Sequence, residues 1–127
     1  MPIPHLGHDL VDIARFSKIL ARREAGFRRR IFTEAEWDRA AARPDRDAVL
    51  AARFAAKEAA LKALGTGWGR GVAWRDVEVV GGGRTAPRLE LRGEALRCAQ
   101  EAGVVLLLSI SHTDGMASAV VMAWPAS

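Results

Sequence analysis

The first third of the chain changes from strand spacing to helix spacing at Asp12. Residues 3–11 alternate in the manner of a β-strand, so the odd positions share one face, Asp9 among them. Beyond Asp12 the apolar residues recur at helical spacing, which predicts a helix that Gly26 ends or bends. The pattern therefore begins with a strand that leads directly into a helix.

Two more helices are predicted in the next third of the chain. Thr33 and Glu36 match a capping box, which satisfies two free backbone donors and starts a short helix. A longer helix covers residues 47–64 and ends at Gly65. Its core-facing stripe contains four large apolar residues: Leu50, Phe54, Leu61 and Leu64. A second row of residues lies beside the stripe: Ala51, Ala55, Glu58 and Lys62. Because the alanines in it are small, another body has room to approach the two charged residues.

The second half of the chain contains mostly strands. We expect strands at residues 74–80 and 89–91 around a glycine turn, then a short helix at 94–102. The last two strands, at 104–110 and 116–123, join around Asp114-Gly115, which is a strong hairpin signal. Since strands and helices do not alternate regularly, the expected fold class is α+β rather than a doubly wound parallel sheet.

Length and composition predict one globular domain over residues 1–127. Half of the residues are hydrophobic and 27% are charged, as in ordinary globular proteins that bury a core. The longest strongly apolar run, Val104 to Leu108, is far too short to cross a membrane, and the N-terminus does not resemble a signal peptide. Cys98 is the only cysteine, so no internal disulfide forms, and we expect a cytoplasmic protein.

The basic residues are unevenly distributed in type and position. The net charge is +4, and sixteen of the nineteen basic residues are arginine. A positive balance suits an anionic partner, whether nucleic acid, phosphorylated ligand or acidic protein. Scattered arginines such as Arg39, Arg84 and Arg97 are explained as well by nucleotide composition. The five arginines between Arg22 and Arg30 are not explained so easily.

Two carboxylates are candidates for a metal site. Asp9 lies on a strand expected to be mostly buried, where an unpaired carboxylate is costly; as an alternative, it caps the helix that follows. Glu58 by itself reads as half of a surface pair with Lys62. Together, Asp9 and Glu58 supply two hard oxygen ligands from different elements, which suits Mg²⁺ bound together with substrate phosphates. Lys62 would then neutralise a further phosphate oxygen.

Two polar segments are candidates for binding the same anion. The backbone N–H groups of Gly65, Thr66 and Gly67 are available as donors, although this loop follows a helix and is not a P-loop. Ser111, His112 and Thr113 lie at the end of a strand. Adjacent Ser111 and His112 point to opposite faces and no nucleophile elbow accompanies them, so a polar strand end is favoured over a hydrolase pair.

Six segments of the chain resemble the holo-acyl-carrier-protein synthases, the small bacterial 4′-phosphopantetheinyl transferases. In chain order they are GHDLVDI at 7–13, IFTEAE at 31–36, RFAAKEAALKALGTG at 53–67, WRDVEV at 74–79, P-x-L-x-L-x-G-x-A at 87–95 and SISHT at 109–113. The F-x-x-K-E-A segment is specific, and the resemblance covers essentially the whole chain. It implies the phosphopantetheinyl transferase fold, a small and mainly antiparallel sheet packed with helices.

The resemblance implies an activity and assigns residues to it. Such enzymes move the phosphopantetheine arm of coenzyme A onto a serine of an apo acyl carrier protein, in fatty-acid or polyketide synthesis, and release 3′,5′-ADP. By resemblance, Asp9 and Glu58 hold Mg²⁺ and Lys62 balances charge on the leaving group. Either Glu58 or a metal-bound water is the base. Coenzyme A binding is implied for Arg53, Lys62, Gly65, Thr66, Gly67, Ser111, His112 and Thr113.

Protein partners are also implied by the resemblance. Acyl carrier proteins are acidic, and in this family they meet the first helix and the segment after it, which makes four residues the expected docking face: Arg15, Ile19, Phe27 and Arg30. Family members form homotrimers with active sites at subunit boundaries. The chain departs from the family at three positions: His5 and His8 add polarity beside the metal site, and Trp68 is bulkier than expected. Neither nucleic acid nor a membrane is an expected partner.

Two other functions are retained as alternatives. A basic nucleic-acid-binding module would explain the arginine content, but the sequence has no tyrosine and no helix-turn-helix or zinc signature. A protein that binds coenzyme A or a carrier without turnover is the second alternative. The presence of Asp9, Glu58 and Lys62 argues for an active enzyme instead.

Overall fold

The computed structural model describes residues 5–67 and 71–127, so Trp68 lies outside the described residues. The elements follow in the order β1 (His5–Asp12), α1 (Ile13–Arg30), α2 (Glu34–Ala41), α3 (Arg46–Leu64), the 3₁₀ turn η1 (Trp74–Asp76), β2 (Val77–Gly82), β3 (Thr85–Leu91), α4 (Gly93–Ala102), β4 (Val104–His112) and β5 (Met116–Pro125). The α+β class is confirmed. No helix in the described ranges is both long and apolar enough for a membrane crossing.

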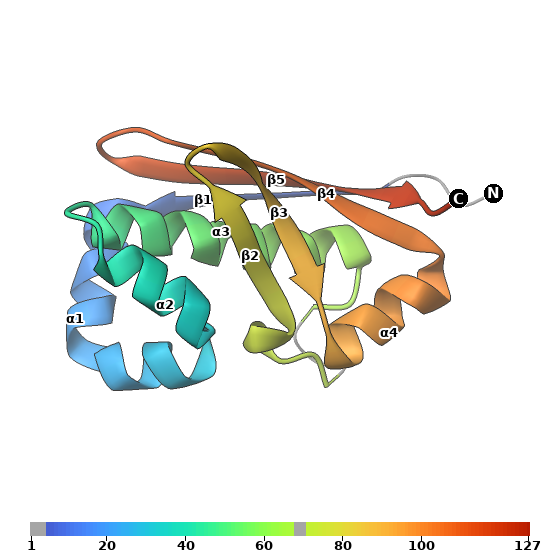
Figure 1. Cartoon of the computed structure of the whole chain (residues 1–127), viewed down its shortest axis with the longest axis horizontal. Helices are drawn as coiled ribbons and strands as arrows, with labels where there is room; N and C mark the ends of the chain where they lie inside the picture. The colour runs from blue at the N-terminus through green and yellow to red at the C-terminus, as the bar shows by residue number, and fades with distance from the viewer. Residues whose placement is uncertain (1–4, 68–70) are drawn as a thin grey trace.

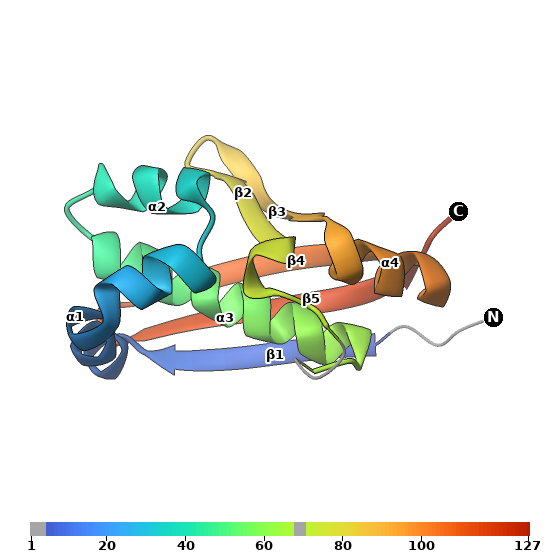
Figure 2. The ribbon, with the colours of Figure 1, turned by 90° about the horizontal axis from the view of Figure 1, so that it is seen from below.

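A three-stranded antiparallel sheet forms one layer, and α3 lies across one of its faces (Figures 1 and 2). The strand order is β1-β5-β4. Seen from the α3 side, α1 lies beside β1, whereas α2 and the β2–β3 hairpin lie toward β4 (Figure 2). The central helix is therefore enclosed by the sheet behind it and by other elements along both sides.

Small residues allow α3 to lie close to the sheet. A Cβ at Gly7 would stand 1.8 Å from the carbonyl oxygen of Ala59, so only glycine fits where β1 passes α3. Buried alanines continue this contact on β5 and on α3: Ala117, Ala119, Ala123, Ala55, Ala56, Ala60 and Ala63. The room that the alanines of α3 leave is taken by the sheet itself.

Local signals in the sequence placed most element ends correctly. The capping box of Thr33 and Glu36 is present in both directions. Gly65 ends α3 in the left-handed region, at φ 73°, as a C-terminal glycine is expected to do. The hairpin between β4 and β5 is likewise confirmed, with Met116 and His112 as the nearest strand ends.

Several boundaries differ from the prediction; the strand expected at 89–91, for example, begins at Thr85. The backbone of α1 leaves helical geometry at Arg23, with φ −133° and ψ 30°, so the bend lies before Gly26 rather than at it. The strand expected at residue 74 begins instead at Val77, after η1. The Asp76 side chain accepts a hydrogen bond from the backbone N–H of Ala73 at 3.1 Å, and this bond stabilises the 3₁₀ turn.

Candidate active site

Asp9 and Glu58 line the same cleft, of about 510 Å³, between β1, α1 and α3. Strand alternation turns Asp9 to the face that carries Gly7 and α3. Glu58 enters the cleft from α3, the element that forms its opposite wall. The structure therefore brings together the two carboxylates that the sequence proposed as metal ligands.

Lys62 forms an ion pair with Asp9. Its Nζ lies 3.3 Å from Asp9 Oδ1 and donates to the carbonyl oxygen of His8 at 2.9 Å. The Asp9 side chain is 19% exposed and that of Lys62 54%, so the pair bridges the cleft and the solvent. The helix-capping alternative for Asp9 is wrong, because Asp12 is the N-cap of α1 and accepts from the Arg15 N–H at 2.9 Å.

The donor set fits a hard divalent cation that takes further ligands from a substrate. Carboxylate oxygens are the ligands that Mg²⁺ prefers, and none of the described lining residues is a histidine or cysteine. Within residues 5–67 and 71–127, no group of three or more such acidic, His or Cys side chains is arranged to hold a metal alone. His8 is engaged elsewhere, with its Nε2 3.1 Å from Ser118 Oγ.

A second cleft, of about 280 Å³, gathers positive charge beside α3. Four of its lining residues are basic: Arg53 on α3, Arg39 and Arg43 from α2 and the residues after it, and His112 at the end of β4. Burial lowers the pKa of Arg53; Glu36 opposes this shift, and the charges of Arg39 and Arg43 add to it. Such a convergence of cations favours an anionic ligand.

Two buried polar atoms lack a hydrogen-bond partner in the part of the chain that the structure describes, and both belong to residues predicted to bind coenzyme A. They are Arg53 Nε and Thr66 Oγ1. An unpaired buried group of this kind costs about 1–3 kcal/mol, which a ligand or a water molecule would offset. Thr66 stands between Gly65 and Gly67, both at positive φ, in the loop after α3.

The residues at the end of β4 separate into two groups. Ser111 pairs with Ser118 and His112 with Ala117 across the strands, so their side chains point to opposite faces. His112 lines the basic cleft, and the backbone N–H of Thr113 donates to the carbonyl oxygen of Met116 at 2.9 Å. The expectation that Ser111 and His112 form no nucleophilic pair is confirmed.

The residues predicted to bind coenzyme A do not converge within one chain. Arg53 and His112 line the basic cleft together with Arg39 of α2, whereas Asp9 and Glu58 line the cleft that α1 borders. Figure 2 shows where α1 and α2 lie around α3. Arg53 and Glu58 leave α3 in directions about 140° apart. The loop that follows α3 begins at Gly65, roughly 18 Å along the helix axis from Arg53. One chain therefore presents these groups on different sides and at different ends of α3.

Three of the four predicted docking residues share the cleft of Asp9 and Glu58: Arg15, Ile19 and Phe27. Arg30 lies next to them, in a hollow of about 240 Å³ that Phe27 also lines. The ring of Phe27 stacks on that of Phe54, with 6.5 Å between centroids and 13° between planes. The basic face of α1 thus borders the candidate metal ligands.

The model of one protein family matches most of the chain. Residues 5–121 match the 4′-phosphopantetheinyl transferase superfamily. The chain belongs to this superfamily. The resemblance that six sequence segments indicated is thereby confirmed.

Relatives of this transferase superfamily match over nearly their whole lengths. A holo-[acyl-carrier-protein] synthase of Syntrophotalea carbinolica is 46% identical over 118 residues, which cover 92% of each chain. Its counterpart from Brucella ovis is 44% identical over 112 residues, 86% of this chain and 84% of that one. Among solved structures, the ACPS–CoA complex of Chronobacterium ammoniagenes has a TM-score of 0.84 at 32% identity, covering 99% of this chain and 100% of that chain.

Sequence reasoning gave no role to two arginines that line the basic cleft of this transferase. Arg39 donates to the carbonyl oxygen of Gly82 at 2.9 Å, and Arg43 forms an ion pair with Asp45 at 2.8 Å. Their spacing of four residues on and after one helix was the available signal, since it places both on one face. Nucleotide composition is therefore not needed to explain Arg39.

Lys57, inside the F-x-x-K-E-A segment, is also unexplained by the sequence pattern. The structure buries it entirely and places its Nζ 2.9 Å from Glu36 Oε1. It also donates to the carbonyl oxygens of Trp74 and Val77. Burial lowers the pKa of Lys57, and the charge and hydrogen bond of Glu36 oppose that shift.

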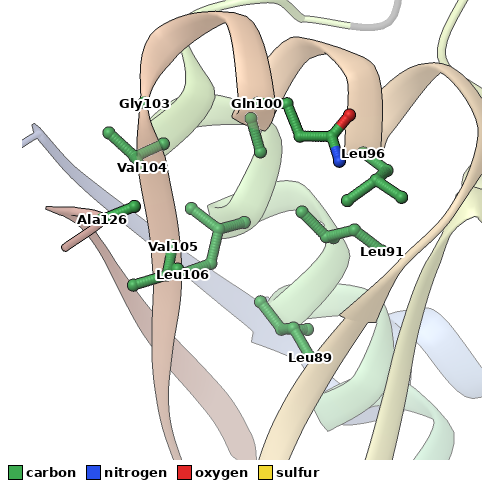
Figure 3. Close-up of a pocket in the computed structure, with 10 residues that line it drawn as sticks. Leu89, Leu91, Leu96, Gln100, Gly103, Val104, Val105, Leu106 and Ala126 are labelled. Carbon is green, nitrogen blue, oxygen red and sulfur yellow. The ribbon is translucent and has the colours of Figure 1, made fainter.

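An apolar cavity of about 470 Å³ lies apart from these residues, between α4, β3 and the start of β4 (Figure 3). Its lining is mostly leucine, valine and alanine, and Gln100 is the one polar side chain among the described lining residues. None of the predicted site residues lines it. None of its described lining residues is ionisable.

Proposed function

We propose that this protein is a holo-acyl-carrier-protein synthase, which transfers the 4′-phosphopantetheine arm of coenzyme A to a serine of an apo acyl carrier protein and releases 3′,5′-ADP. The observation that carries the proposal is the cleft shared by Asp9, Glu58 and Arg15. It sets carboxylates for a metal-bound pyrophosphate beside a basic helix suited to an acidic carrier. The carrier would serve fatty-acid synthesis, with polyketide synthesis as the alternative.

Asp9 and Glu58 would hold Mg²⁺ in this cleft. When bound, the ion would withdraw charge from the pyrophosphate and stabilise the oxygen that leaves with 3′,5′-ADP. In the free protein Lys62 neutralises Asp9. A cation at Asp9 would weaken that ion pair, and the exposed Lys62 ammonium would then be available to the departing phosphate.

The reaction needs one bond made and one broken. The carrier serine oxygen bonds to the phosphorus that bears the pantetheine arm, and the bond from this phosphorus to the bridging oxygen of the ADP group breaks. The serine proton passes to a base in the cleft, for which Glu58 is the candidate. α1 would deliver the serine, because Arg15, Ile19 and Phe27 border the carboxylates. Positioning and electrostatics supply most of the catalysis in such transfers.

Coenzyme A would reach its other contacts through a neighbouring copy of the chain. Arg53 supplies a cation, His112 an imidazole ring and Thr66 an unpaired hydroxyl, yet Arg53 and His112 line a different cleft from Asp9 and Glu58 of their own chain. A homotrimer with sites at subunit boundaries would place the basic cleft of one copy near the carboxylates of the next. The separation of the two clefts within one chain supports this arrangement.

The outer face of the three-stranded sheet supplies a surface for that assembly. Six large apolar side chains there are 40% to 63% exposed: Leu6, Leu10, Val105, Leu107, Val120 and Trp124. An apolar surface of this kind marks a contact with a partner. We also propose that residues 1–127 form one domain, since the two buried clusters share Val11 and Ile110. A cytoplasmic location is consistent with the free, buried thiol of Cys98.

Intact-mass spectrometry of an apo acyl carrier protein tests the proposal. After incubation with this protein, coenzyme A and Mg²⁺, we expect the carrier to gain the mass of one phosphopantetheine arm. Glu58→Ala and a chelator should each abolish the gain. Glu90→Ala, which removes an exposed carboxylate outside both clefts, should not. No gain and no coenzyme A binding would exclude the assignment, and tight, salt-dependent DNA binding in its place would favour a nucleic-acid-binding module.

A further inference from the structure

Lys57 joins α3 to three other parts of the molecule through one buried ammonium group. Its Nζ meets the Glu36 carboxylate of α2 at 2.9 Å, the Trp74 carbonyl of η1 at 3.2 Å and the Val77 carbonyl at the start of β2. Both charged side chains of the pair are 0% exposed. Since the carbonyls supply further acceptors, all the contacts converge on a single atom.

The Glu36 carboxylate is itself fixed in place. Its Oε1 accepts from the backbone N–H of Thr33 at 2.9 Å, and its Oε2 accepts from that of Val79 at 2.8 Å. The partner that Lys57 reaches is therefore tied both to the start of α2 and to β2. A displacement of α3 against these elements would break an ion pair whose partner cannot follow.

Glu58 directly follows Lys57, on the side of α3 that faces α1. Successive residues of a helix point about 100° apart, so fixing the direction of Lys57 also fixes that of Glu58. The contacts of Lys57 also connect to the cleft through Trp74. The Trp74 ring stacks on Phe54, with 5.1 Å between centroids and 18° between planes, and Phe54 lines the cleft that contains Glu58.

Stability alone does not require a buried ion pair here. Apolar residues of similar volume often stabilise a core as well as such a pair or better, because both charges lose their hydration. What the ion pair adds is a fixed rotation of α3 about its own axis. A roll of α3 by about 10° would move a side-chain end, about 6 Å from the axis, by about 1 Å. A displacement of that size at a reacting centre costs about 100-fold in rate.

We propose that Lys57 is a positioning residue for Glu58: its buried contacts with Glu36, Trp74 and Val77 set the rotation of α3 that aims the Glu58 carboxylate at Asp9 across the cleft. This inference rests on the proposed function and deepens it. Lys57 touches neither the reacting groups nor the cation, so its removal should change cation binding through Glu58 while the fold persists.

The test replaces the pair without leaving a buried charge. The double variant Lys57→Met with Glu36→Gln keeps an acceptor for the capping box. The charge-matched control is Arg88→Met with Glu90→Gln, which removes an ion pair of 3.7 Å whose partners both lie on β3, outside the two clefts. Urea denaturation reports the fold of both. Mn²⁺ binding is measured by the loss of the EPR signal of the free ion, and a sample with coenzyme A but no protein gives the background. This measurement tests the metal-binding carboxylates without relying on activity.

We expect the Lys57–Glu36 variant to bind Mn²⁺ at least about tenfold more weakly and to lose a similar factor in kcat at saturating metal. Its KM for coenzyme A should change far less, and the control should match the wild type. A folded Lys57–Glu36 variant with unchanged Mn²⁺ binding and kcat would overturn the proposal. Equal losses in the control would do the same, since they would mean a general structural effect.

A single variant covers the case in which the double variant does not fold. Glu36→Gln retains Lys57 on its two carbonyl acceptors. It removes the charge pair and exchanges the oxygen that accepts from the Val79 N–H for an amide NH₂, and we expect about a tenfold weakening of Mn²⁺ binding. Unchanged binding there would also overturn the inference. The proposed function fails separately: if the wild type neither transfers the arm nor binds Mn²⁺ in a manner sensitive to Glu58→Ala, the reaction itself is wrongly assigned.

Discussion

Asp9 and Asp12 lie on the same strand and have different partners. Asp12 caps α1, whereas Asp9 pairs with Lys62 at the cleft. Strand alternation predicts the face of Asp9, but aspartate is favoured at helix caps as well, so the sequence does not tell which of the two is the cap. Lys57 is harder still to predict, because its partner lies on another helix and no local pattern signals a buried ion pair.

The carboxyl of Glu78 leads to a prediction for acid stability. Burial raises the pKa of Glu78, but hydrogen bonds from Thr33 and Arg92 outweigh burial, so its pKa lies below the usual value. A lowered folded-state pKa stabilises the fold above the unfolded-state value, about 4.3, and this stabilisation is lost as the pH falls through the folded-state value. Glu78→Gln should therefore cost about 1–3 kcal/mol at neutral pH and lose less stability on acidification.

Urea denaturation at a series of pH values, from neutral to about pH 3, measures both effects. Glu34→Gln is the control, because it removes one negative charge from an exposed position. The wild type and the control should fall in parallel as acid is added, and the Glu78 curve should be flatter. Three parallel curves would mean that Glu78 does not contribute to the acid dependence.

At the scale of helices and strands, the signals that worked act over a few residues. The capping box, the C-terminal glycine of α3 and the Asp114-Gly115 turn each fix a chain direction locally. The errors lie elsewhere, and the one at η1 coincides with contacts between distant parts, since Lys57 donates to the Trp74 and Val77 carbonyls. The kink of α1 falls at Arg23, and η1 takes the place of the first residues of a predicted strand. Periodicity within one segment contains no information about such contacts.

The contact between β1 and α3 leads to a prediction with a built-in control. Gly7→Ala would place a Cβ 1.8 Å from the Ala59 carbonyl oxygen and 2.8 Å from the Ala63 nitrogen. Because both neighbours are backbone atoms, the strand must move, and we expect a loss of about 3 kcal/mol or more, or failure to fold. A Cβ at Gly26 would meet nothing within 4 Å. Gly26→Ala should therefore stabilise the helix, by about 0.5–1 kcal/mol.

Denaturant midpoints of the two alanine variants test this contrast directly. Loss of stability in Gly7→Ala should also lower metal binding, since Asp9 lies on the same strand face. If Gly7→Ala were as stable as the wild type, the close approach of β1 to α3 would be wrong. If Gly26→Ala were less stable than the wild type, we would conclude that α1 bends at Gly26 instead.

At the scale of the whole molecule, the pattern of apolar residues does not predict what covers each face of the sheet. The apolar strands β4 and β5 carry hydrophobic residues on both faces, and α3 covers only one of them. The other face exposes Leu107 and Trp124 by 53% and 50%. Alternation cannot distinguish a face that packs on a helix from one that packs on another chain. The question for experiment is whether Arg53 of one copy and Glu58 of the next complete one site.

Mixing two inactive variants answers that question. Glu58→Ala loses a carboxylate of one cleft, and Arg53→Met loses the central cation of the other while keeping most of its packing volume. Each variant alone should transfer little phosphopantetheine. If a site takes Glu58 from one copy and Arg53 from the next, mixed assemblies contain sites with neither substitution, about a quarter of the total for random association of equal amounts. Co-expression with different tags isolates these assemblies.

The mixing experiment distinguishes a site built within one chain from a site shared between two copies. A site built within one chain can never be restored by mixing, since every chain carries one of the two substitutions. A site shared between copies must regain activity in the mixed assemblies, and sedimentation should give a mass of several chains. Adding Trp124→Lys to both variants should then remove assembly and restored activity together, because a charge would enter the apolar face of the sheet. If the mixed variants assemble but activity is not restored, Arg53 and Glu58 of the same chain would have to act in one site.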